Sequence, residues 1–143
     1  MRTLTFAAVM AVAGTCAMAD DIATEVFEGD VGDAAFAVEN AIVDAGLVID
    51  YVSNVGDMLD RTGADLDLGP SPVGAEAKIF VFCSALVSRE VMEADPMNVS
   101  NCPYGIFVAD IDGATVVGHR RYAAETMEPV NVLLSDIVAA AIE

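Results

Sequence analysis

The stretch from Lys78 to Val108 constrains the fold most strongly, because it encodes a strand, a helix and a second strand in succession. It begins KIFVF, a run rich in β-branched and aromatic side chains, as a buried strand requires. The following helix is expected to end before Pro96, since proline disfavours helical geometry in the residue that precedes it. A short polar segment then leads into a second strand at 105–110. We expect the rest of the chain to assemble around these two strands.

Hydrophobic periodicity and turn-forming residues predict the remaining elements of one domain. The chain of 143 residues is long enough for a single hydrophobic core, and 55% of its residues are hydrophobic. Four helices are expected. The first ends at Gly46, the second spans 53–62, the third lies between Ser84 and Asp95, and the fourth begins at Glu128. The expected strands are 22–27, 47–52, 78–82, 105–110 and 114–120. This order predicts an α/β (α+β) fold, a two-layer sandwich in which helices cover one face of a mixed sheet of about five strands.

Two of the predicted helices carry apolar stripes that should face the sheet, because side chains at helical spacing share one face. The stripe of the first helix consists of Ala35, Val38, Ile42 and Ala45, and it is widened by Phe36 and Val43. The stripe of the last helix contains Leu133, Leu134, Ile137 and Val138. We expect both stripes to be buried, together with Phe107 of the sheet.

Turn and capping residues mark further boundaries. Asp30 or Asp33 is placed to cap the first long helix. Asp112-Gly113 favours a hairpin between the last two strands, because such a turn needs positive φ at both residues. The segment 63–75 holds prolines and glycines and is expected to be a surface loop.

The beginning of the chain has the pattern of a cleaved export signal. Arg2 supplies a positive start, an apolar stretch too short to span a bilayer follows, and 17–19 form an A-x-A cleavage site. We therefore expect a leader at 1–19 and one mature domain at 20–143, periplasmic or secreted, with no membrane insertion after cleavage. A lipid anchor on Cys16 is the alternative, which the threonine before it disfavours.

The chain is strongly acidic, with 23 acidic and six basic residues and a net charge of −17. Removal of 1–19 takes away Arg2 and no acid, which leaves a mature charge of −18. Proteins bind nucleic acid and anionic lipid surfaces through lysine and arginine, so this charge excludes nucleic acid as a partner. The acid excess is typical of a soluble protein, and a cationic partner is the alternative interpretation.

Cys83 and Cys102 are the leading site candidates. The compartment of an exported protein does not keep thiols reduced, so the two cysteines indicate a structural disulfide. Three alternatives stay open: a redox-active pair in which the start of the helix lowers the pKa of Cys83, a soft-metal or haem site, and two free buried thiols. A soft-metal site would need Met97 and His119 to join the cysteines.

The disulfide requires a particular arrangement of the two strands. A parallel pair joined by a right-handed crossover would leave the cysteines about 17–20 Å apart, the length of a strand. A bridge needs Cα atoms within about 7 Å of each other. We therefore predict an antiparallel or returning arrangement that places Cys83 and Cys102 within bonding reach at one edge of the sheet.

Arg120 and Arg121 form the only basic cluster of the chain. They are expected to pair with nearby carboxylates, and the alternative is that they anchor a small anionic ligand. His119 is expected to be a half-exposed polar residue near the end of a strand. No residue set indicates catalysis or a particular cofactor, so an enzyme is not indicated.

Four short motifs together resemble the domain of unknown function 302 family, a small α/β domain found in bacteria. They are Phe82-Cys83-Ser84-Ala85, Met92-Glu93-Ala94-Asp95-Pro96, Asn101-Cys102-Pro103-Tyr104, and Gly118 followed by Arg120. The resemblance is strongest over 78–121. It implies this fold and allows a homodimer, and it implies no settled activity.

The expected function is that of an exported, non-enzymatic domain that binds a small ligand or a protein, with a structural Cys83–Cys102 disulfide. The alternative is a thiol-redox, soft-metal or haem-handling protein that uses the same cysteines. The candidate ligand-binding residues are Ser84, Asn101, Tyr104, His119 and Arg120.

Overall fold

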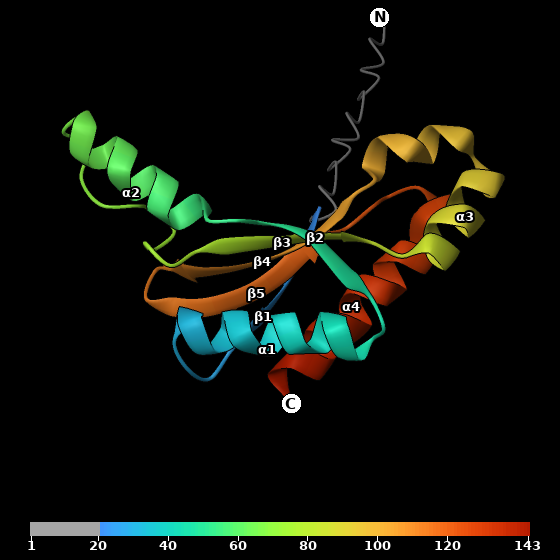
Figure 1. The fold of residues 1–143 in the computed structure, drawn as a ribbon, viewed down its shortest axis with the longest axis horizontal. Coiled ribbons are helices and arrows are strands. Elements are labelled where there is room, and N and C mark those ends of the chain that lie inside the picture. The colour runs from blue at the N-terminus through green and yellow to red at the C-terminus, as the bar shows by residue number, and fades with distance from the viewer. Residues whose placement is uncertain (1–20) are drawn as a thin grey trace, which may run out of the picture.

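The computed structural model describes residues 21–143, in which five strands and four α-helices follow one another. The expected leader at 1–19, its cleavage and the alternative anchor at Cys16 lie outside the described residues. The elements run in the order β1 (Ile22–Val26), α1 (Val31–Asp44), β2 (Val48–Ser53), α2 (Val55–Asp65), β3 (Lys78–Cys83), α3 (Ala85–Ala94), the 3₁₀ helix η1 (Pro96–Asn101), β4 (Tyr104–Ile111), β5 (Ala114–Arg120), the 3₁₀ helix η2 (Glu125–Met127) and α4 (Glu128–Ile142) (Figure 1).

Local sequence signals set several of these boundaries. Asp30 caps α1 by accepting a 2.8 Å hydrogen bond from the backbone N–H of Asp33, so the first of the two predicted caps is the one used. Ser84 caps α3 in the same way, by accepting a hydrogen bond from a backbone N–H of the first turn. Asp112 and Gly113 have φ of 55° and 82° and form the predicted turn between β4 and β5.

The five strands form one sheet in the order β1-β5-β4-β3-β2, and every neighbouring pair is antiparallel. The predicted α/β class with helices packed on the sheet is confirmed, although the sheet is antiparallel instead of mixed. The reason lies in the connection between the two central strands. Because α3 and η1 return the chain to the edge at which β3 ends, β4 starts there, and Phe82 pairs with Tyr104.

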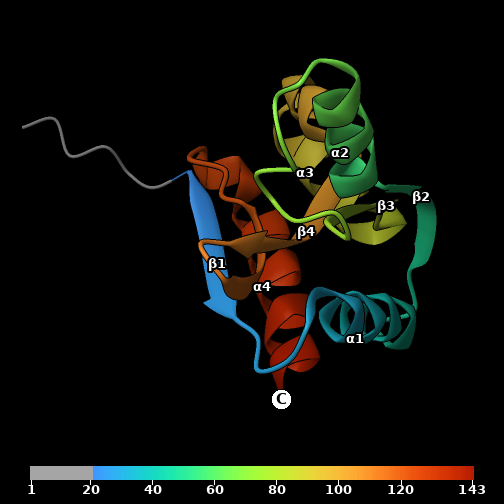
Figure 2. The ribbon, with the colours of Figure 1, turned by 90° about the vertical axis from the view of Figure 1, so that its left-hand side faces the viewer.

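Helices α1 and α4 cover one face of the sheet, and α3 packs against α4 (Figure 1, Figure 2). The core lies between these helices and the sheet. Its largest fully buried side chains include Tyr104, Phe80, Phe82, Ile42, Ile106, Met127 and Leu134. Of the predicted helical stripes, the buried members are Ala35, Val38, Ile42, Leu134, Ile137 and Val138, and Leu133 is half-buried against them.

Four predicted core residues lie elsewhere. Phe36 and Val43 are 68% and 56% exposed, because α1 rests on the sheet along a narrower stripe than expected. Ala45 is exposed just beyond the end of α1. Phe107 points to the opposite face of the sheet, since the residues on either side of it in β4 are fully buried under the helices and side chains alternate along a strand.

Helix α2 projects away from the rest of the domain (Figure 1, Figure 2). It continues to Asp65, beyond the expected end at Thr62, because Gly63 does not stop it. A Cβ added at Gly63 would lie 2.0 Å from the carbonyl oxygen of Gly69, so the glycine allows the following loop to pack directly on the helix.

Helix α4 begins at Glu128 as predicted, with Pro129 in its first turn. Proline is tolerated there because the backbone N–H groups of a first turn make no hydrogen bond within the helix. Its buried residues are Val130, Leu134, Ile137, Val138 and Ala141. Within residues 21–143, neither α4 nor any other helix has the length and apolar character needed to cross a membrane.

Candidate functional site

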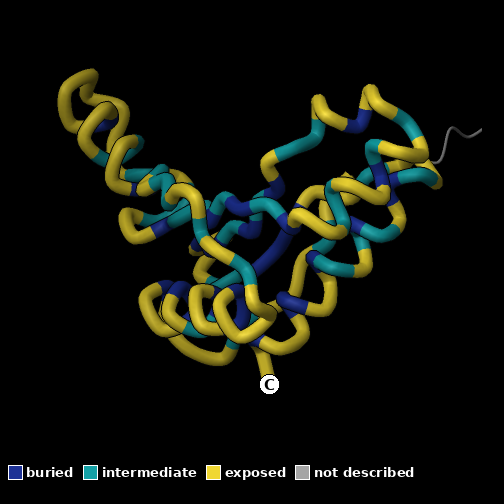
Figure 3. Tube along the Cα trace, turned by 45° about the vertical axis from the view of Figure 1, so that its right-hand side comes forward, coloured by how far each residue is buried: buried dark blue, intermediate teal, exposed yellow. Residues whose placement is uncertain are grey.

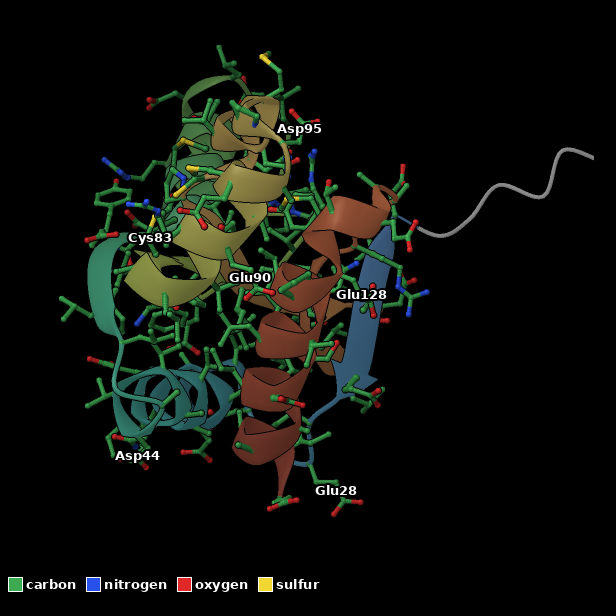
Figure 4. The ribbon with its side chains drawn as sticks, turned by 90° about the vertical axis from the view of Figure 1, so that its right-hand side faces the viewer. Glu28, Asp44, Cys83, Glu90, Asp95 and Glu128 are labelled. Atoms are coloured by element: carbon green, nitrogen blue, oxygen red, sulfur yellow. The ribbon has the colours of Figure 1, made fainter. Side chains whose placement is uncertain are left out.

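The two cysteines meet at the edge of the sheet where β3 ends and β4 begins. Because these strands are antiparallel, Cys83 ends β3 at the same edge at which Cys102 precedes β4. Their sulfur atoms lie 2.7 Å apart, which confirms the predicted antiparallel arrangement with the thiols in reach of each other. A disulfide has an S–S distance of about 2.05 Å, so the covalent bond is not formed in this structure and stays a prediction. Figure 4 shows Cys83 at the junction of β3 and α3.

The surroundings of the thiol pair are polar on one side. The Ser88 hydroxyl on α3 lies 3.9 Å from the sulfur of Cys102 and 3.1 Å from the hydroxyl oxygen of Tyr104. Ser88 was not identified from the sequence, because only the packing of α3 beside η1 brings it to Cys102. The side chain of Tyr104 is fully buried, and burial raises the pKa of its hydroxyl.

The thiol of Cys83 is not activated. Burial, followed by the hydrogen bond and the charge of Cys102, raises the pKa of Cys83 to about 12. Ser84 is the cap of α3, so Cys83 lies one residue outside the helix, where the helix dipole has little effect. The lowered pKa considered for a redox-active Cys83 is therefore not found, and the pair is better suited to a structural bond than to nucleophilic chemistry.

His119 is buried, in contrast to the half-exposed position expected for it. Its Nδ1 lies 2.8 Å from the carbonyl oxygen of Arg120, and its Nε2 lies 3.1 Å from the hydroxyl oxygen of Ser135 on α4. Burial and the nearby charge of Arg121 lower the pKa of His119, although the bond to the Arg120 carbonyl opposes this. The ring is therefore neutral, with Nδ1 donating to the carbonyl and Nε2 accepting from the serine.

The soft-metal set considered from the sequence does not assemble. Both ring nitrogens of His119 are engaged under α4, and the side chain of Met97 is exposed on η1. Within residues 21–143, no three histidine, cysteine or acidic side chains are grouped in a way that could hold a metal ion. Cys83 and Cys102 alone would supply two ligands.

Two of the predicted ligand-binding residues, Asn101 and Arg120, line one cavity of about 430 Å³. The cavity lies between the end of β5, the start of β1 and the end of η1. Its lining residues are Asp21, Ile22, Asn101, Arg120, Arg121, Tyr122, Ala123, Ala124 and Met127. The other predicted candidates do not line it: Ser84 is buried as the cap of α3, Tyr104 lies in the core, and His119 faces α4.

The cavity concentrates positive charge that the rest of the described chain does not neutralise. The ion pairs of residues 21–143 join Arg61 to Asp57 at 3.1 Å and Arg89 to Glu93 at 2.5 Å. Arg120 and Arg121 belong to neither, so the pairing expected for them is not found. The labelled acids of Figure 4 lie on separate elements. One of them, Glu128 at the start of α4, is linked to the cavity segment because the amide of Asn131 donates both to Glu128 and to the carbonyl of Tyr122. Among the described residues, Asp21 is the single acidic residue in the cavity lining.

The segment that carries the arginines is held firmly in place. The side-chain amide of Asn131 on α4 accepts from the backbone N–H of Tyr122 and donates to the carbonyl of Tyr122, both at 2.9 Å. The backbone N–H of Arg121 donates to the carbonyl of Asp21 at 2.7 Å. Asn131 was not identified from the sequence, because only the packing of α4 brings its side chain to the backbone of Tyr122.

Tyr122 connects the cavity with the thiol pair. Its hydroxyl donates to the carbonyl of Asn101 at 3.4 Å, and its ring meets the ring of Tyr104 edge to face, with centroids 6.5 Å apart. Burial raises the pKa of Tyr122, while the positive charge of Arg120 acts in the opposite direction. Arg120 and Tyr122 both line the cavity, so both are available to one ligand.

Among solved structures, the fold is similar to the crystal structure of the uncharacterized conserved protein DUF302 from Bacillus stearothermophilus, with a TM-score of 0.70. The likeness covers 87% of this chain and 100% of that chain at 12% sequence identity, so it shows a shared fold. This confirms the fold implied by the sequence resemblance. No protein-family model matches the chain, and no curated protein matches it.

Proposed function

We propose that this chain is a small exported binding domain that takes a small anionic ligand, a phosphate or carboxylate compound, in the cavity at Arg120 and Arg121. A structural Cys83–Cys102 disulfide beside the cavity would hold one of its walls. The observation that carries the proposal is the pair of adjacent arginines that form no ion pair within the described residues, in a chain with 23 acids.

Charge supports an anionic ligand. Both arginines line the cavity, and a guanidinium group binds an anion through charge-assisted hydrogen bonds. Arginine is suited to this task because its planar fork matches the geometry of carboxylate and phosphate. The net charge of −17 keeps anionic polymers and surfaces away, so the ligand is small enough to enter a local positive site.

The size and lining of the cavity support a small molecule. Its volume of about 430 Å³ lies within the range of ligand pockets, about 300–1,000 Å³. Ile22 and Met127 supply apolar wall, whereas Asn101 and the hydroxyl of Tyr122 supply polar contacts beside the arginines. Asp21 would disfavour a ligand with charge on every side, and it favours one with a single acidic end.

The disulfide has a structural role in this proposal. Asn101 precedes Cys102 directly, so a bond to Cys83 would tie the η1 wall of the cavity to the end of β3. When the Cys83–Cys102 bond forms, the two thiols lose two protons and two electrons. A second, external disulfide in the oxidising compartment accepts them and is reduced to two thiols. The raised pKa of Cys83 favours this structural role over a redox-active one.

Titration of the oxidised protein with methyl phosphate and with butyrate, each of which has a single acidic end, followed by amide NMR, tests the proposal. We expect the amide signals of residues 120–124 to shift, and either Arg120→Gln or Arg121→Gln to weaken binding about tenfold or more, the loss of one charge-assisted hydrogen bond. Arg89→Gln is the matched control, because Arg89 is exposed on α3 and pairs with Glu93. Equal weakening by all three variants, or shifts that avoid residues 120–124, would overturn the assignment.

A further inference from the structure

The face of the sheet opposite α1 and α4 is apolar as well. The residues of the five strands that alternate with the buried ones point to this side. We call this surface the open face, and its apolar side chains are Ile22, Val26, Val48, Tyr51, Ile79, Val81, Phe107 and Val116. An antiparallel sheet that faces water normally alternates apolar with polar residues, so two apolar faces indicate that both are covered.

The open face is exposed in the single chain. Ile22, Val26, Val48 and Tyr51 are each more than half exposed, and Phe107 and Val81 at its centre are half-buried. Along the central strands β3 and β4, intermediate residues alternate with buried ones in Figure 3. A contiguous exposed apolar surface of this kind is typical of an interaction site.

Charge distinguishes the open face from the rest of the molecule. The chain has 23 acids, but none of them is among the open-face residues that pair with a neighbouring strand. The one charged residue among these positions is Arg120 at the end of β5. Asp50 lies in the β-bulge of the edge strand β2. Two copies of a chain with net charge −17 would repel each other through most surfaces, but not through this one.

Helix α2 is a second unpartnered element on the same side. Its buried residues are two glycines, which pack on its own loop, while Met58 is exposed on it and Leu66 and Leu68 are exposed directly after it. A helix of 11 residues is marginal on its own, so tertiary packing must stabilise it. Figure 1 shows α2 and η1 rising at opposite ends of the sheet, so that the open face forms the floor between them.

From these observations we propose that the open face is the interface of a symmetric homodimer, in which two copies of this chain place their open faces together and the α2 arm of each flanks the other. The second copy fits because it presents an apolar floor whose paired strand positions also lack carboxylates, which keeps carboxylates out of the contact between the two sheets. The aspartates of α2 would lie at the rim of this contact. The contact is isologous, so the arm of each copy packs on its partner in the same way and the assembly closes at two chains.

Sedimentation of the oxidised mature protein over a range of concentrations, with light scattering, tests this interface. We expect a dimer, and we expect the double variant Val26→Glu, Tyr51→Glu to raise the dimer dissociation constant about thirty-fold or more, because it places unpaired carboxylates in an apolar contact. Both side chains are exposed, so the folded monomer should tolerate the changes, which circular dichroism checks.

Phe36→Glu is the matched control, because Phe36 is equally exposed but lies on α1, on the covered side of the sheet. It should leave the dimer intact. Hydrogen exchange gives an independent readout: amides of α2 should gain protection with increasing protein concentration. A wild-type monomer at the highest soluble concentration, or a dimer that Phe36→Glu disrupts and the double variant does not, would overturn the proposal.

Discussion

The sulfur of Cys83 lies 2.7 Å from the sulfur of Cys102, across the edge of the sheet where β3 ends and β4 begins. This contact joins residues that are separated by a helix and η1, so a bond between them would close a loop over the whole α3 segment. The same edge carries Asn101, which lines the arginine cavity. Stability and ligand binding should therefore both depend on the oxidation state of this pair.

The first prediction concerns that bond. In the protein purified from its own compartment, we expect no thiol of Cys83 or Cys102 to react with a thiol reagent under denaturing, non-reducing conditions. Reduction should lower the free energy of unfolding by about 3 kcal/mol, the value for a loop of this length. Cys102→Ser is the control, since reduction should not change its stability. Two reactive thiols in the purified protein would contradict the disulfide.

The second prediction concerns the core. Ile137 is 3% exposed on α4, and truncation to alanine leaves a cavity between α4 and the rest of the core. We expect Ile137→Ala to lower the free energy of unfolding by about 2–5 kcal/mol in urea denaturation. Val132→Ala on the exposed side of the same helix should change it by about 0.5 kcal/mol or less. Similar losses in both variants would contradict the role of burial, and helix propensity would not explain them, because alanine is the better helix former.

The third prediction tests the electrostatics of the cavity. Arg120 opposes the burial that raises the pKa of Tyr122, so Arg120→Gln should raise that pKa further, as measured by carbon NMR of the tyrosine ring during a pH titration. Arg121→Gln should change the pKa of Tyr122 less than Arg120→Gln does, because the charge of Arg121 acts on His119. An equal rise in both variants would mean that the two guanidinium groups are interchangeable at the cavity.

The fourth prediction follows from the lowered pKa of His119. The unfolded chain takes up a proton near the ordinary histidine pKa of about 6.5, whereas folded His119 stays neutral to lower pH. The stability that His119 contributes is therefore fully present above that pH and is lost as the pH falls below it, by at most about 1.4 kcal/mol per pH unit.

His119→Gln removes this titration, so the difference in unfolding free energy between wild type and variant should shrink as the pH falls from neutral towards 5. The comparison also cancels the titration of the many carboxylates that both proteins share. A difference that stays constant over this range would show that His119 does not change its protonation on unfolding.

Local signals in the sequence predicted the elements well, for physical reasons that act within a few residues. A cap such as Asp30 or Ser84 works through a hydrogen bond inside one helical turn. The turn at Asp112-Gly113 depends on the backbone freedom of those two residues. Such features need no knowledge of the rest of the chain, so β5 and α4 begin where they were expected.

The sequence by itself also limited Cys83 and Cys102 to meeting in an antiparallel or a returning arrangement, because a disulfide needs the two Cα atoms close together. Tertiary structure decided the rest. Side chains alternate along β4, so Phe107 points to the face opposite to that of Ile106 and Val108. Both faces are apolar, and only the packing of the helices decides which one is covered. Likewise, only the placement of distant carboxylates leaves Arg120 and Arg121 without an ion pair among residues 21–143, because an ion pair depends on distance in space and not along the chain.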